Sequence, residues 1–170
     1  TTISRFLENY QGEKYKIELP EGSWGMYGTH YTWWNPEVEW MWGHIHLAER
    51  RMVALVSKYL HEDGFGDMVL EQLGRELLLV ESSDWPFLVT TAQAKGYGKK
   101  RLLEHTNYFH RLANSLEKYF KSGEFEEKDL LEELKEINNP FHPINIEVYT
   151  SEEPPSVKEY IEPTEIPKDE

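Results

Sequence analysis

The sequence predicts a mainly α-helical fold, a bundle of four or five helices with a loop rich in tryptophan and glycine and an extended acidic C-terminal tail. Apolar residues recur at alternating spacings of three and four through several long stretches, which is the period of an amphipathic helix. Glycine or proline stands at the ends of most of these stretches. With 170 residues, of which 39% are hydrophobic and 14% aromatic, the chain can bury a core of its own.

The first elements are expected to be short. Residues 2–9 can form a helical end capped by Thr2 or Ser4. Residues 14–19 alternate polar and apolar side chains, which predicts a short strand. Residues 20–36 then form a loop of glycine and aromatic residues.

The clearest helix is predicted from Pro36 to about His61, with Asn35 as its N-cap and proline at its first position. Its apolar stripe consists of Val38, Met41, Ile45, Ala48, Met52, Leu55 and Tyr59. Gly64 and Gly66 follow the end of this stripe, so they are expected to terminate the helix.

Four further helices are predicted. Asp67 can cap the first of them, which includes the apolar run at residues 77–80. Pro86 can open a short second helix. The third runs from about Gly98 to Lys121 and is stopped by Gly123, and the fourth covers residues 128–137. The proline-rich remainder has one possible strand at residues 144–149. We therefore expect residues 1–123 to form the domain core and residues 124–170 to pack on it as an acidic helix and extended tail.

Charge and composition exclude several classes of function. Of the formal charge of −13, residues 1–123 carry −2 and residues 124–170 carry −11, and the one basic cluster, residues 99–101, is short. Nucleic-acid binding is therefore not expected. No apolar run is long enough for a membrane helix. The absence of cysteine excludes disulfides and fits the cytoplasm, and the Glu- and Lys-rich composition suggests a thermophilic source.

Two tryptophans of the loop are candidate ligand contacts. Trp24 and Trp33 lie in a segment with Gly22, Gly25 and Gly28, which allow unusual backbone conformations. An indole ring can stack on the apolar face of a pyranose, whose rim carries hydroxyls. The alternative is that both rings are hydrophobic anchors that hold the loop. Trp40 and Trp42 lie on a helix beside its apolar stripe and are expected to serve in packing.

Asp84 and Gln93 are the candidate polar contacts. Asp84 could cap the helix that follows it, or its carboxylate could accept hydrogen bonds from ligand hydroxyls. Gln93 lies about two helical turns further along and could present its amide to the same space.

No residue is predicted to be catalytic, and neither a metal nor another cofactor is expected. His44 and His46 are two residues apart, and His105 and His110 are five apart, so neither pair has the spacing that helical metal ligands favour. Exposed-nucleophile and phosphate-loop motifs are absent. The carboxylates near the loop are explained as helix-end or surface charges.

Several segments together resemble a known family. These are GSWG, a tryptophan nine residues after Trp24, and the stretches NPEVEWMWGHIHLAE, RELLLVESSDWPF and TTAQAKGYGKKRLLEHTNYFHRL. They resemble the C-terminal helical domain of family 57 glycoside hydrolases, in the group of α-glucan branching enzymes and intracellular α-amylases. The resemblance covers about residues 1–120, and SSDWPF is its most specific part.

The resemblance implies that catalysis and substrate binding are shared between two domains. A catalytic (β/α) barrel upstream would supply a glutamate nucleophile and an aspartate acid/base in a retaining mechanism. This domain would line the cleft for amylose, glycogen or maltooligosaccharides with Trp24, Trp33, Asp84 and Gln93, and would be inactive alone. Branching of 1,4-α-glucan is favoured. A hydrolysing α-amylase of the same family and a non-catalytic protein-interaction module remain the alternatives.

Overall fold

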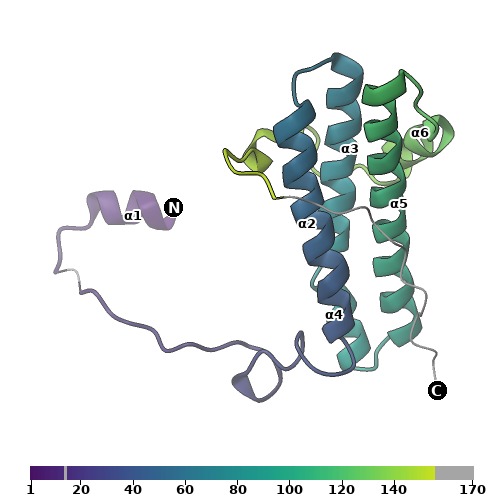
Figure 1. Ribbon diagram of the computed structural model, residues 1–170. Helices are drawn as coiled ribbons and strands as arrows, with labels where there is room; N and C mark the ends of the chain where they lie inside the picture. The colour runs from purple at the N-terminus through teal and green to yellow at the C-terminus, as the bar shows by residue number, and fades with distance from the viewer. Residues whose placement is uncertain (14, 156–170) are drawn as a thin grey trace.

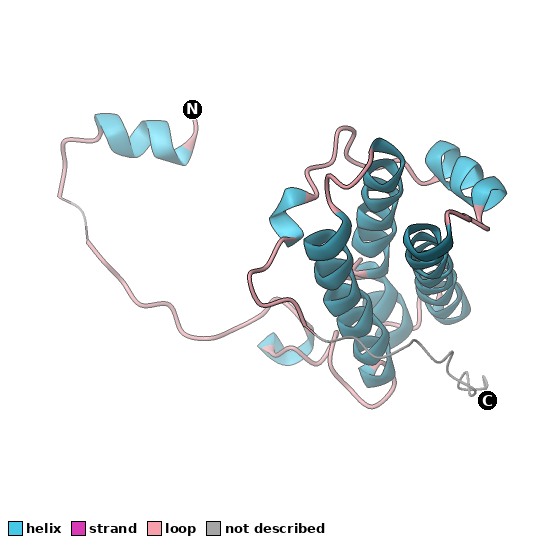
Figure 2. Cartoon of the chain, turned by 45° about the horizontal axis from the view of Figure 1, so that its top comes forward, coloured by secondary structure: helices cyan, strands magenta, loops and turns pink. Residues whose placement is uncertain are grey.

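The structure is a computed structural model that describes residues 1–13 and 15–155. Three long helices, α2, α3 and α5, lie side by side, and α6 packs beside them (Figures 1 and 2). No strand occurs within the described residues, which confirms the mainly α prediction. The elements in chain order are α1 (Ile3–Asn9), η1 (Met26–Gly28), α2 (Glu39–Tyr59), α3 (Gly64–Val80), α4 (Asp84–Thr90), α5 (Lys95–Ser122), α6 (Lys128–Ile137) and η2 (Glu147–Tyr149).

Helix α2 buries the whole apolar stripe that the sequence predicts, from Val38 to Tyr59. It begins three residues later than expected, because Asn35 closes a turn instead of capping the helix. The Asn35 Oδ1 atom accepts from the Glu37 backbone N–H at 2.9 Å. Its amide donates to the Tyr31 carbonyl and the Thr90 hydroxyl, each at 2.8 Å. Asn35 thus ties the end of the loop to α4.

The ends of α3 and α5 are fixed by specific groups. Asp63, not Asp67, caps α3, and its side chain accepts from the Gly66 N–H at 2.6 Å. Asp67 instead accepts from the His61 backbone N–H at 2.8 Å. Gly123 ends α5 with a φ of 78°, a left-handed conformation that glycine adopts without strain. The prediction for Gly123 is therefore confirmed, and the one for Asp67 is wrong.

Two groups of buried side chains form the core. The larger group joins α2, α3, α5 and α6, and includes Met52, Leu73, Phe109 and Leu134. The smaller one joins the first half of α2 to the end of α3, to α4 and to the start of α5. It contains Val38, Met41, Ile45, Val80, Val89 and Leu102. Trp40 and Trp42 pack against it, as predicted. This second core supports the tryptophan-rich loop.

The segment after α6 packs against α3. Gly74 lies under Ile144 and Ile146, whose atoms would be 3.2 Å from a Cβ at that position. The Asn138 amide donates to the buried Glu76 carboxylate at 2.8 Å. The strand expected at residues 144–149 is wrong, because this segment has no strand beside it and ends in η2.

The N-terminal segment lies apart from the bundle in both views (Figures 1 and 2). Thr2 caps α1 by accepting from the Arg5 N–H at 3.3 Å, but α1 buries none of its residues. Residues 15–19 are irregular and exposed, so the strand predicted at residues 14–19 is wrong in its described part. An alternating pattern alone does not make a strand when no partner strand is present.

Candidate functional site

The loop before α2 is held by a small set of hydrogen bonds. The Ser23 N–H donates to the Gly28 carbonyl at 3.3 Å, and the Gly28 N–H donates back to the Gly25 carbonyl at 2.9 Å. Gly28 has a φ of 69°, which glycine adopts without strain. The buried Thr32 hydroxyl accepts from the Met26 N–H at 2.9 Å. The loop is therefore a defined structure from which side chains can project.

Trp24 and Trp33 come together in this loop. Their ring centroids are 5.1 Å apart, and the planes meet at 80°, an edge-to-face pair. Trp24 is 78% exposed, whereas Trp33 is partly buried. The Phe87 ring of α4 lies 5.9 Å from Trp24 and extends the aromatic surface. The pair is not enclosed in the bundle, so the Trp24 ring remains available to a ligand.

Trp33 connects the loop to the turn between α3 and α4. Its indole Nε1–H donates to the Ser83 carbonyl at 3.2 Å, and its own carbonyl accepts from the Trp42 indole at 2.8 Å. Gly25 makes this arrangement possible, because a Cβ there would come within 2.8 Å of the Trp33 ring. The exposed ring of Trp24 thus rests on a partner that is fixed at both its ring and its backbone.

The two polar candidates lie at opposite ends of α4. Asp84 is the first residue of α4, directly after Ser83, and its side chain is exposed. No side-chain cap bond forms at this helix end, so the capping alternative for Asp84 is not what the structure has. Gln93 is exposed in the turn after α4, and α4 has seven residues, about 10 Å of helix. Asp84 thus directly follows the Ser83 carbonyl that Trp33 binds, and Gln93 lies beyond the other end of α4.

A buried polar cluster lies beneath the α3–α4 turn. Trp85 donates its indole N–H to the Leu79 carbonyl at 2.7 Å, and its ring lies over His105 at 6.3 Å with an angle of 21°. His105 and Glu76 are both fully buried, and His105 Nδ1 lies 2.8 Å from a Glu76 oxygen. The Arg101 guanidinium is 2.8 Å from His105 Nε2. Because a guanidinium can only donate, Nε2 accepts and Nδ1–H donates to the carboxylate.

The same loop also borders an open hollow of about 460 Å³. It is lined by Thr29, His30, Tyr31 and Trp34. Trp34 is 60% exposed and packs at 6.0 Å against Trp42. The tryptophan-rich loop therefore presents a second aromatic surface besides the Trp24 ring.

The charges around the turn are few. Burial and, to a smaller extent, the nearby Glu49 carboxylate together raise the pKa of Glu81 to about 7. Lys95 pairs with Glu37 at 2.5 Å near the far end of α4. Within residues 1–13 and 15–155, no group of three or more His, Cys, Asp or Glu side chains could hold a metal ion. In the same residues, no helix is long and apolar enough to cross a membrane.

An exposed indole suits a ligand with a flat apolar face, and a carboxylate such as that of Asp84 can accept hydrogen bonds from a rim of hydroxyls. Sequence reasoning missed two members of this arrangement, Phe87 and the Ser83 carbonyl. Phe87 belongs to the same SSDWPF segment as Asp84, and its helical spacing of three residues from Asp84 could have indicated it. The arrangement is thus a candidate binding surface on a helical domain.

Comparison with known proteins identifies the family. The sequence family of the C-terminal region of 1,4-α-glucan branching enzymes matches residues 44–149. This chain therefore belongs to the family of branching-enzyme C-terminal domains. The chain is also 58% identical over 165 residues to the 1,4-α-glucan branching enzyme TK1436 of Thermococcus kodakarensis, covering 97% of this chain and 24% of that protein.

Solved structures agree in fold. The crystal structure of a GH57-type branching enzyme from Pyrococcus horikoshii is 61% identical with a TM-score of 0.89, covering 98% of this chain and 31% of that one. The structure of TK1436, solved in complex with glucose and additives, is 57% identical with a TM-score of 0.89, and the match covers 98% of this chain and 30% of that one. The α-amylase AmyC of Thermotoga maritima is 29% identical with a TM-score of 0.62, and the match covers 87% of this chain and 26% of that one. The chain thus spans about a quarter to a third of its relatives.

Proposed function

We propose that this chain is the glucan-binding C-terminal domain of a retaining 1,4-α-glucan branching enzyme. Trp24 stacks on a glucose unit, Trp33 holds Trp24 in place, and Asp84 and Gln93 accept or donate hydrogen bonds to sugar hydroxyls. The catalytic carboxylates belong to the enzyme's own N-terminal barrel. Residues 1–123 form the cleft-lining core and residues 124–170 pack on it. The contacts of residues 138–146 with α3 support this division for part of the tail, and residues 156–170 lie outside the described residues.

The observation that carries this proposal is the exposed Trp24 ring on a fixed support. Trp24 is 78% exposed and forms one contiguous aromatic group with Trp33 and Phe87, and contiguous exposed apolar patches mark binding sites more often than single exposed rings do. Trp33 is anchored at 3.2 Å to the Ser83 carbonyl, one residue before Asp84. The support of the Trp24 ring is therefore fixed before any sugar arrives, which lowers the entropy lost on binding.

The proposed role in the reaction follows from water exclusion. In branching, a hydroxyl of a second glucan chain, rather than water, must resolve the covalent glycosyl-enzyme intermediate. Aromatic walls that position the acceptor and exclude water favour that outcome. In the complete enzyme, Trp24→Ala is expected to lower transfer more than hydrolysis, as measured by branch formation against new reducing ends. Equal losses of both activities would contradict this role.

A hydrolysing α-amylase is the alternative within the same family. The identity of 58–61% to branching enzymes, against 29% to an α-amylase, supports transfer. The same assay distinguishes the two functions, because an amylase produces reducing ends without branches. We further place the enzyme in the cytoplasm, with glycogen-like polymers as its substrate, and the absence of cysteine supports that location.

The binding proposal is tested by titrating the chain with maltooligosaccharides while following tryptophan fluorescence. The expected result is a saturable change that Trp24→Ala abolishes. The matched control is Tyr27→Ala, which removes another ring of the same loop, 84% exposed but outside the indole pair. A response that survives Trp24→Ala, or that Tyr27→Ala removes equally, would show that the sugar does not use the indole pair.

A further inference from the structure

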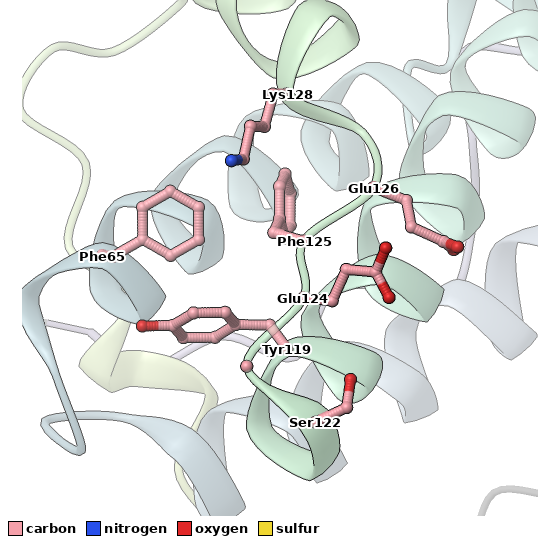
Figure 3. A pocket seen from close by; sticks show the side chains of 8 residues that line it. Phe65, Tyr119, Ser122, Glu124, Phe125, Glu126 and Lys128 are labelled. Atoms are coloured by element: carbon pink, nitrogen blue, oxygen red, sulfur yellow. The ribbon is translucent and has the colours of Figure 1, made fainter.

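A second pocket lies at the other end of the bundle, where α5 ends and α3 begins. Its volume is about 750 Å³, within the range of about 300–1,000 Å³ found for small-molecule pockets. Figure 3 shows the rings of Phe65, Tyr119 and Phe125 around the hollow, with the Lys128 amine reaching over it. Its lining consists of Phe65, Tyr119, Ser122, Gly123, Glu124, Phe125, Glu126 and Lys128.

The aromatic walls of this pocket are held in place. The Phe65 ring lies 4.9 Å from Tyr119 and 5.1 Å from Phe125, in edge-to-face arrangements. The Tyr119 hydroxyl donates to Asp63 Oδ2 at 3.1 Å, and Asp63 is also the N-cap of α3. Tyr119 is therefore fixed at both ends, by its own helix and by the neighbouring one. The ring surface does not need to be ordered when a ligand binds.

The polar groups of the pocket nearly balance in charge. Lys118, which lies outside the lining, pairs with Glu124 at 2.9 Å and with Glu126 at 2.5 Å, and Lys128 is the amine of the lining itself. An anion would face two carboxylates here, and a cation would face the Lys128 ammonium group and carboxylates that Lys118 already neutralises in part. A neutral ligand with hydroxyls can donate to the carboxylates and accept from Lys128. Flat aromatic walls with such a rim match the two kinds of surface that a pyranose presents.

We propose that this pocket is a second α-glucan contact site, distant from the indole pair. The inference rests on the proposed function for the identity of its ligand. Helix α5 starts near α4 and ends at the pocket, and its 28 residues span about 40 Å. A short oligosaccharide therefore occupies one site at a time, whereas a long glucan can contact both. The second site would hold the polymer while its chain end moves in the cleft.

The sequence offers separate reporters for the two sites. All six tryptophans lie between residues 24 and 85, and none lines the second pocket. Indole NMR signals thus follow the first site, and the assigned ring signals of Phe65 and Tyr119 follow the second. During titration of the chain with maltotriose, the proposal expects saturable shifts of the Phe65 and Tyr119 signals.

Two variants make this test specific. Lys128→Ala is expected to weaken the response of the Phe65 and Tyr119 signals at least three-fold, the loss of a hydrogen bond from a charged donor. Lys121→Ala, which removes an exposed amine of the same region outside the lining, should leave the response unchanged. Equal weakening by both variants would mean nonspecific binding and would overturn the proposal.

The outcomes separate this inference from the proposed function. If indole signals shift while Phe65 and Tyr119 do not, the second site is wrong and the indole site stands. If Phe65 and Tyr119 shift without the indoles, the second site stands and the indole site is wrong. If neither set shifts, both proposals fail.

Discussion

Replacing Gly25 by alanine should displace Trp33 without straining the backbone. Gly25 has φ −61° and ψ 175°, which alanine adopts freely. The added Cβ would lie 2.8 Å from Trp33 Cζ3 and 2.6 Å from the Thr29 carbonyl oxygen. Neither distance is tolerable, so the ring or the loop must move. Such overpacking costs about 1–3 kcal/mol, and loss of the bond from Trp33 to Ser83 adds about 1 kcal/mol.

The assay is urea unfolding combined with the maltooligosaccharide titration. Gly25→Ala is expected to lower the free energy of unfolding by about 2–4 kcal/mol and to weaken sugar binding about ten-fold, since Trp24 loses its partner. Gly22→Ala is the control, because the nearest atom to its Cβ is 4.0 Å away and its φ is not positive. Wild-type affinity together with an unchanged Trp33 indole signal in Gly25→Ala would refute the reasoning.

Two further predictions concern ionisable groups near the turn. Because the pKa of Glu81 is raised to about 7, the folded state keeps this proton after the unfolded state has released it, and stability falls as pH rises from about 4.5 to 7. Glu81→Gln should therefore be more stable than the wild type at pH 8, by about 1 kcal/mol after allowance for solvent screening. At pH 4 the two proteins should be equally stable. A gain in stability that does not depend on pH would contradict this prediction. Glu76→Gln should lower the free energy of unfolding, measured with urea, by about 2–3 kcal/mol. His105 and Asn138 both donate to the Glu76 carboxylate, and an amide in its place would direct its own N–H at one of these two donors. The exposed Glu71→Gln on the same helix should lose less than about 1 kcal/mol, and similar losses for both would be inconsistent with the buried cluster.

Residues whose role is set by local period were predictable from the sequence. The stripe of α2 and the bounds of α6 follow from the apolar spacing, and Gly123 from its need for a left-handed backbone. Roles that depend on distant contacts were not. Asn35 was expected to cap α2, but its amide bonds to Thr90, 55 residues away, and so it closes the loop instead.

In the candidate site, too, local sequence patterns indicated some residues, whereas contacts between distant residues were not predictable. The composition of the loop and the SSDWPF segment indicated Trp24, Trp33 and Asp84, and the structure brings the two indoles together beside the turn that carries Asp84. The bond from Trp33 to Ser83 joins residues 50 positions apart, which no local pattern encodes. Gln93 was expected to face the same space, and it lies beyond the opposite end of α4. Its contact with sugar remains a prediction.

The most direct measurement of the central claim is a crystal structure of the chain with a linear maltooligosaccharide bound. The account predicts a glucose ring in van der Waals contact with the Trp24 face and a hydroxyl within hydrogen-bond distance of Asp84. Sugar bound elsewhere, with both the Trp24 face and the Asp84 carboxylate in contact with solvent alone, would contradict it.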